Sequence, residues 1–156
     1  MAKILILNGP NVGIIGYREP ELYGSEPLSA TMERCAALAA GADVEVEVLT
    51  SNHEGVLLDR LHEITRGDQG RDVDAILVNP GGLTPYGLAL RDALKTTFRP
   101  VVVVHVSNKP AKTDGDFRHL DIIAPIARGN IVGLGVLGYE LATRWILQEL
   151  LGHQLD

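Results

Sequence analysis

The stretch PVVVVHVSN, residues 100–108, decides the fold of this chain. Its valines form an almost continuously apolar run, which is typical of a parallel strand covered by helices on both faces. The run ends in His105, Ser107 and Asn108, so polar side chains follow as soon as the buried strand ends. Similar apolar runs predict further buried strands at 3–7, 74–79 and 130–135.

The run VEVEVL at 44–49 differs, because its valines alternate with glutamates, and it predicts an edge strand with one wetter face. Segments with helical spacing of apolar residues separate these runs. Their stripes are Leu28, Met32, Cys35 and Ala39; Leu57, Leu58, Leu61 and Ile64; Ala89, Leu90 and Ala93; and Leu147, Leu150 and Leu151. This alternation predicts an α/β fold, a doubly wound five-stranded parallel sheet in a single domain over 1–156.

Composition excludes several classes of function. The chain has 156 residues and a net charge of −6, which disfavours nucleic acid as a partner. No apolar run reaches membrane-spanning length and no signal-peptide pattern begins the chain, so we expect a cytoplasmic protein with no membrane partner. The single cysteine, Cys35, cannot form an internal disulfide.

Neither a metal nor a nucleotide cofactor is predicted. No histidine has a second histidine or cysteine at metal-ligand spacing. The stretch GLGVLG, 133–138, matches the glycine pattern of dinucleotide sites, but no further strand with a ribose-binding acid follows it. Close packing of a helix on a strand explains these glycines better.

Polar residues follow four of the five predicted strands. In parallel sheets the strand ends meet at one edge, where ligands bind. His105 and Ser107 are two residues apart and therefore share a face of their strand. The sequence thus predicts a site for a polar small molecule at this edge. The polar residues are Asn8 and Asn11, then Ser51, Asn52, His53 and Glu54, then Asn79, and finally His105, Ser107 and Asn108.

The segment LNGPNVGIIGYREPELYG, 7–24, places Arg18 and Tyr23 between Gly16 and Gly24. A tyrosinate can act as a general base, and a nearby guanidinium favours the ionised form. The glycines would let a loop at about 16–24 move as a lid. We therefore interpret this loop as one that delivers a base together with the charge that activates it.

Seven motifs in order give the chain a family resemblance: NGPN…REPELYG, SNHEG, NPGGLT, ALRDAL, VHVSN, FRH and VGLGVLGY. Over about residues 3–151 the sequence resembles the type II 3-dehydroquinate dehydratases. The resemblance implies a flavodoxin-like fold, a homo-oligomer (a dodecamer of trimers) and no cofactor. It also implies a lyase that dehydrates 3-dehydroquinate, a small-molecule substrate, to 3-dehydroshikimate. That reaction serves the shikimate pathway of aromatic amino acid biosynthesis or quinate catabolism.

The resemblance also assigns catalytic roles. Tyr23 corresponds to the base that removes a proton beside the ketone, and Arg18 to its lid partner. Asn11 matches the asparagine that stabilises the enolate, and His105 matches the acid that protonates the leaving hydroxyl. Elimination beside a ketone through an enolate requires such a base, an oxyanion stabiliser and an acid.

Five further residues match substrate-binding positions of the family. Asn79, Ser107 and Arg118 correspond to residues that hold the hydroxyls and the carboxylate, with help from the backbone of Val106. Arginine suits a carboxylate because its planar fork binds both oxygens. Asp92 matches a carboxylate that reaches the site of a neighbouring subunit.

Two positions depart from the family pattern. Pro85 replaces a histidine next to the substrate hydroxyls, and Val103 replaces a glutamate two residues before His105. A valine cannot fix the tautomer of that histidine. These losses leave open a family member that acts on another cyclic hydroxy-ketone or hydroxy acid, or a catalytically silent ligand-binding member. Retention of the catalytic set argues against the silent member.

Overall fold

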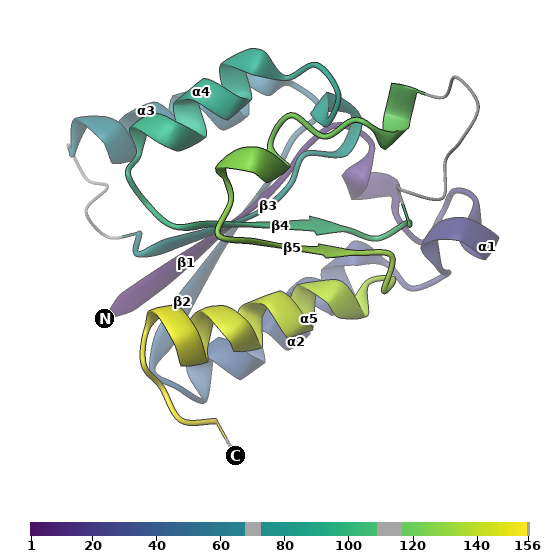
Figure 1. Cartoon of the computed structure of the whole chain (residues 1–156). Helices are drawn as coiled ribbons and strands as arrows, with labels where there is room; N and C mark the ends of the chain where they lie inside the picture. Colours follow the sequence, from purple (N-terminus) through teal and green to yellow (C-terminus); the bar gives the residue numbers. More distant parts are fainter. Residues whose placement is uncertain (68–72, 109–116, 156) are drawn as a thin grey trace.

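Parallel strands form the central sheet of the computed structural model, which describes residues 1–67, 73–108 and 117–155 (Figure 1). The strands are β1 (Ala2–Asn8), β2 (Val44–Thr50), β3 (Ala75–Asn79), β4 (Val101–His105) and β5 (Gly129–Val132). Their order in space is β2-β1-β3-β4-β5, which is the order of flavodoxin-like doubly wound sheets. The predicted fold class is confirmed, and the alternating run forms edge strand β2 as expected. The prediction of a buried strand at 130–135 is wrong, because β5 forms the other edge of the sheet and none of its residues is buried. The proposed 1–156 domain also includes 68–72, 109–116 and 156, which lie outside the described residues.

Helices cover both faces of this sheet (Figure 1). On one face α2 (Leu28–Ala40) packs beside α5 (Leu137–Trp145), and on the other α3 (Glu54–Arg66) packs beside α4 (Leu88–Thr96). Successive strand residues point to opposite faces. Ile4 and Ile6 therefore join the α2 and α5 core, whereas Leu5 joins the α3 and α4 core. No helix in the described ranges is long and apolar enough to cross a membrane.

The helical stripes are confirmed in part. All four predicted α2 residues are buried, as are Leu57, Leu61 and Ile64 of α3. The prediction for Ala89 in α4 is wrong, because this residue is exposed and Leu94 is buried in its place. Leu90 and Leu94, four residues apart, set the face that α4 presents to the core.

The C-terminal helix lies close to the sheet at Gly138. A Cβ atom there would be 3.3 Å from Ile131 and 3.4 Å from Val104, tighter than ordinary packing. Glycine thus lets α5 approach β4 and β5 closely, so the prediction for GLGVLG is confirmed at Gly138. Gly133 and Gly135 instead adopt φ of +84° and +63°, and a Cβ atom on Gly135 would have nothing within 4 Å. After α5 the chain makes a wider turn, η6 (Ile146–Leu150), in which Leu147 is buried while Leu150 is only partly buried.

A buried chain of hydrogen bonds joins the ends of three strands to α5. Tyr139 donates its hydroxyl hydrogen to Asn8 Oδ1 at 2.7 Å and accepts a hydrogen bond from Asn79 Nδ2 at 2.8 Å. Asn8 Nδ2 donates in turn to Thr50 Oγ1 at 3.1 Å. Burial raises the pKa of Tyr139 well above its ordinary value, although the bond from Asn79 opposes this. The hydroxyl therefore stays protonated and keeps its double role.

This chain gives a stability prediction. Tyr139→Phe removes the hydroxyl and leaves buried polar atoms of Asn8 and Asn79 without that partner. We expect the free energy of unfolding to fall by about 1–3 kcal/mol, measured by urea denaturation. The control is Tyr17→Phe, the same change on a side chain that is 80% exposed. Equal stability of the two variants would contradict the assigned role.

Candidate active site

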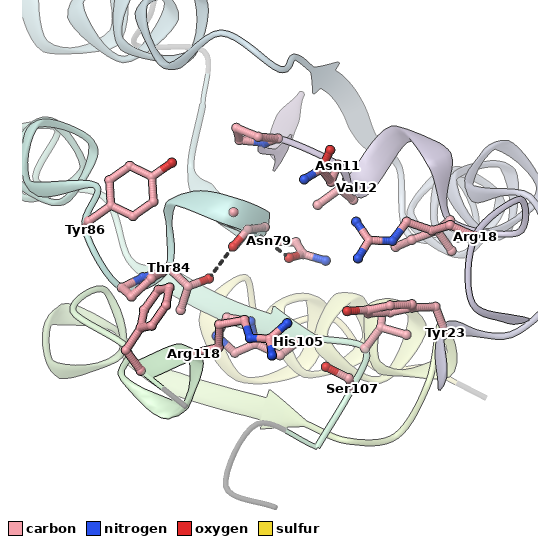
Figure 2. A pocket seen from close by; sticks show the side chains of 17 residues that line it. Asn11, Val12, Arg18, Tyr23, Asn79, Thr84, Tyr86, His105, Ser107 and Arg118 are labelled. Carbon is pink, nitrogen blue, oxygen red and sulfur yellow. Dashed lines mark hydrogen bonds between the residues drawn. The ribbon is translucent and has the colours of Figure 1, made fainter. Parts of the chain in front are cut away.

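A cavity of about 320 Å³ opens at the carboxyl edge of the sheet, within the size range of small-molecule sites (Figure 2). Residues from the segments after β1 and β3, from the end of β4 and from the turn η4 (Phe117–His119) line it. A cavity therefore lies at the strand ends, where the sequence predicts the site, and its use as a binding site stays a prediction. Eight of the nine residues selected from the sequence line it: Asn11, Arg18, Tyr23, Asn79, His105, Val106, Ser107 and Arg118.

Asp92 is the ninth, and it lies elsewhere. It is on α4, its side chain is 71% exposed, and its carboxylate is 3.4 Å from Arg91 Nη1. The resemblance assigns it to a neighbouring subunit's site, and that role stays a prediction.

The cavity carries positive charge although the chain as a whole is acidic. None of the described residues that line it is an aspartate or glutamate, whereas Arg18 and Arg118 both line it. Neutral donors and acceptors such as Asn11, Asn79 and Ser107 complete the polar part. This lining favours a small anionic ligand that also carries hydroxyl or carbonyl groups.

Backbone contacts between two loops hold Asn11 in place. The Gly9 N–H donates to the Asn79 carbonyl at 2.8 Å, and the Gly82 N–H donates to the Pro10 carbonyl at 3.0 Å. A Cβ atom on Gly81 would lie only 2.3 Å from the Pro10 oxygen, and Gly81 has a φ of +56°. Only glycine therefore allows this approach.

The polar residues after β2 support the site instead of lining it. Asn52 Oδ1 accepts a hydrogen bond from the Asn11 N–H at 3.0 Å. Glu54 accepts one from the Leu90 N–H at 3.2 Å, near the start of α4. Asn11 itself has a φ of +68°, a conformation that asparagine adopts more readily than most residues. These contacts fix the loop that carries Asn11.

The predicted lid segment contains a single helical turn, α1 (Pro20–Tyr23), where the sequence suggested only a loop. Pro20 favours this turn, because its fixed φ suits the first helical position. Gly16 and Gly24 flank the segment with φ of +96° and +84°, a backbone conformation that glycine adopts readily. Lid closure itself stays a prediction.

Arg18 and Tyr23 face one another at the cavity, as predicted (Figure 2). The guanidinium carbon of Arg18 is 5.2 Å from the centre of the Tyr23 ring, within cation–π range. Glu19 accepts hydrogen bonds from Arg18 at 2.9 and 3.2 Å. The segment therefore brings the two side chains together, and Glu19 also binds the guanidinium of Arg18.

His105 has a carboxylate partner that the sequence did not reveal. Its Nε2 lies 2.5 Å from Asp121 Oδ2, so a carboxylate contacts this histidine although Val103 replaces the family's glutamate. Val103 is fully buried as expected, and the carboxylate comes from a turn 16 residues beyond His105. The sequence signal was weak, because Asp121 follows the FRH motif without any periodic relation to β4.

The environment of Asp121 favours its ionised form. Burial alone would raise the pKa of this carboxyl group. The hydrogen bond with His105 and those from the N–H groups of Ala124 and Ile123 outweigh burial and lower the pKa of Asp121 below its ordinary value. Asp121 is therefore a carboxylate at neutral pH.

Pro85 and Tyr86 also line the cavity. Pro85 offers no side-chain donor at the position where the resemblance expects histidine. Tyr86, which follows it, is 63% exposed. Thr84, which precedes it, also lines the cavity and donates its hydroxyl hydrogen to the Gly81 carbonyl at 2.7 Å. Among the described residues, no group of three or more His, Cys, Asp or Glu could hold a metal ion.

Comparisons with known proteins agree over most of the chain. The sequence model of the family described as Dehydroquinase class II matches residues 2–147. A 3-dehydroquinate dehydratase of Roseiflexus castenholzii is 46% identical over 145 residues, which cover 93% of this chain and 88% of the relative. Catabolic 3-dehydroquinase 2 of Aspergillus flavus is 43% identical over 152 residues, 97% of each chain. The crystal structure of type II dehydroquinase from Butyrivibrio crossotus has a TM-score of 0.83 at 35% identity and covers 93% of this chain and 97% of that one.

The contact between the two loops gives a second prediction. Gly81→Ala places a Cβ atom against the Pro10 carbonyl in a conformation unfavourable to alanine. We expect a loss of about 2 kcal/mol or more in the free energy of unfolding. Gly55→Ala is the control, because Gly55 is helical and has nothing within 4 Å of the added atom. Denaturation should show no loss for the control, and a similar loss in both variants would contradict the argument.

Proposed function

This chain belongs to the class II dehydroquinase family, and on that basis we propose that it dehydrates 3-dehydroquinate to 3-dehydroshikimate. The observation that carries the proposal is the joint presence of Asn11, Tyr23, His105 and Arg118 around one cavity. They come from three separate segments of the chain, and together they match the groups that this elimination needs.

In the first step, ionised Tyr23 removes a proton from the carbon beside the substrate ketone. The electron pair of that C–H bond moves toward the carbonyl, and an enolate forms. Arg18, 5.2 Å from the ring centre, supports the charged tyrosine. The side-chain amide of Asn11 stabilises the enolate oxygen, partly through a water molecule.

In the second step, His105 donates a proton to the leaving hydroxyl. The enolate electrons form the new carbon–carbon double bond, the C–O bond breaks, and water leaves. The product is a ketone conjugated with that double bond. Tyr23 holds the proton from the first step and His105 has lost one, so the pair must exchange protons with solvent before the next cycle.

The remaining lining residues orient the substrate. Arg118 binds the carboxylate through its fork, together with Ser107 and the backbone N–H of Val106. Asn79 holds a ring hydroxyl, and its amide is already oriented by Tyr139. The positive lining supports an anionic substrate in particular.

We further propose a homo-oligomer, by resemblance a dodecamer of trimers, in which Asp92 of one subunit reaches the next subunit's site. Its side chain is exposed on α4 and is available for such a contact. One relative is named a 3-dehydroquinate dehydratase without a stated pathway, and another is named a catabolic 3-dehydroquinase. We therefore assign the reaction to aromatic biosynthesis or to quinate breakdown, which share it.

One observation supports a second candidate. Pro85 lines the cavity and offers no donor to a substrate hydroxyl. A related cyclic hydroxy-ketone or hydroxy acid that lacks this hydroxyl would lose no hydrogen bond at that position. Such a substrate would undergo the same enolate chemistry with the same base and acid.

The proposed reaction is tested by mixing the protein with 3-dehydroquinate and following the ultraviolet absorbance of the conjugated product. We expect product formation by the parent protein and a fall of at least about a hundredfold in kcat for Tyr23→Phe. Tyr17→Phe is the matched control. If the folded protein forms no product, the proposed reaction is wrong. Ligand-induced stabilisation without turnover would then support the silent, ligand-binding member.

Recognition of the carboxylate is tested at Arg118. Arg118→Gln removes the charged fork from the cavity and should raise KM for 3-dehydroquinate by about tenfold or more. Arg144→Gln is the control, because Arg144 is exposed on α5 and does not line the cavity. Steady-state kinetics of both variants measure the effect, and an unchanged KM in Arg118→Gln would refute the assignment.

A further inference from the structure

The contact between His105 and Asp121 is the feature that the family comparison leaves unexplained. His105 is the last residue of β4, and its Nε2 is 2.5 Å from Asp121 Oδ2. The side chains are 6% and 14% exposed, respectively. Solvent therefore screens this pair much less than a surface ion pair.

Asp121 is itself held firmly. Its Oδ1 accepts hydrogen bonds from the N–H groups of Ile123 and Ala124, both at 2.9 Å. Ile123 is fully buried in the core beneath α3 and α4, and Ala124 begins the turn η5 (Ala124–Ile126). The carboxylate cannot rotate away from His105 without losing both backbone bonds.

Asp121 reaches the cavity only through the histidine. His105 lines the cavity, whereas Asp121 is absent from its described lining. Val103, on the same face of β4 as His105, is apolar and buried. Within the described residues, Asp121 is the one carboxylate that contacts the ring of His105.

We propose that Asp121 is the positioning residue of His105, fixing its tautomer and ring orientation. The inference rests on the proposed dehydration, in which His105 is the acid. With Nε2–H donated to the carboxylate, Nδ1 is the nitrogen that exchanges a proton with the leaving hydroxyl.

Asp121→Asn tests this role with little change in shape. The N–H groups of Ile123 and Ala124 need an acceptor, so they keep the amide oxygen in the place of Oδ1. The amide nitrogen then faces Nε2 and donates to it, which reverses the polarity of the contact. We expect kcat with 3-dehydroquinate to fall about tenfold to a hundredfold, while KM changes less than about threefold.

Two further variants separate positioning from folding. Asp121→Ser keeps an oxygen that can accept from the turn but removes the carboxylate, so its kcat should fall in the same way. Asp59→Asn, an exposed change on α3, should keep the parent kcat. Thermal unfolding of all variants shows whether lost activity reflects lost fold. A kcat within twofold of the parent in either folded Asp121 variant would overturn the proposal.

Nitrogen NMR of the imidazole supplies a readout that does not depend on turnover. His105→Gln identifies the His105 signals among the five histidines. We expect the neutral ring to carry its proton on Nε2 in the parent and on Nδ1 in Asp121→Asn. A parent ring protonated on Nδ1 would refute the pairing. If the parent does not turn over 3-dehydroquinate, the proposed function fails, and this spectrum still decides the role of Asp121.

Discussion

The buried hydroxyl of Tyr139 joins α5 to β1 and β3, the two strands whose following loops line much of the cavity. It donates to Asn8 at the end of β1 and accepts from Asn79 at the end of β3, while its own backbone belongs to α5. Because a hydroxyl has one hydrogen, these two bonds fix the direction of both amides. The Asn79 amide is therefore held in one orientation, and its Oδ1 accepts from the Gly81 N–H at 3.1 Å.

Backbone hydrogen bonds hold the loops that follow β1 and β3 in place. Gly9 donates to the Asn79 carbonyl, and Gly82 donates to the Pro10 carbonyl. Asn11 follows Pro10 in the chain, and its N–H donates a hydrogen bond to Asn52 Oδ1. The two asparagines of the site are thus connected by short, mostly backbone paths, which have little conformational freedom to lose. A site of this kind suits a small rigid ring, for which errors in placement reduce the rate steeply.

The sequence predicted what depends on local pattern. Continuous apolar runs located the buried strands β1, β3 and β4, and alternating valines located β2 at the sheet edge. The apolar run at 130–135 did not reveal that β5 is the opposite edge strand, in which no residue is buried. The predicted stripe of three residues did not determine which face of α4 is buried. It includes Ala89, which is exposed, and omits Leu94, which is buried. The pairing of His105 with Asp121 joins a strand end to an irregular turn, and no periodicity links such positions. Contacts of this type depend on the tertiary fold, and local patterns in one sequence do not report them.

The charges around the cavity are arranged in two layers. Arg18 and His105 line the cavity, and each has a carboxylate behind it, Glu19 and Asp121 respectively. These donors therefore face the cavity, while neither carboxylate is in its described lining. The lining is thus positive although the net charge of the chain is −6, because at short range the nearest groups outweigh the average charge of the chain. This arrangement also explains why a carboxylate for His105 does not have to come from β4: any element that reaches the far side of the ring can provide it, and here the turn before η5 does.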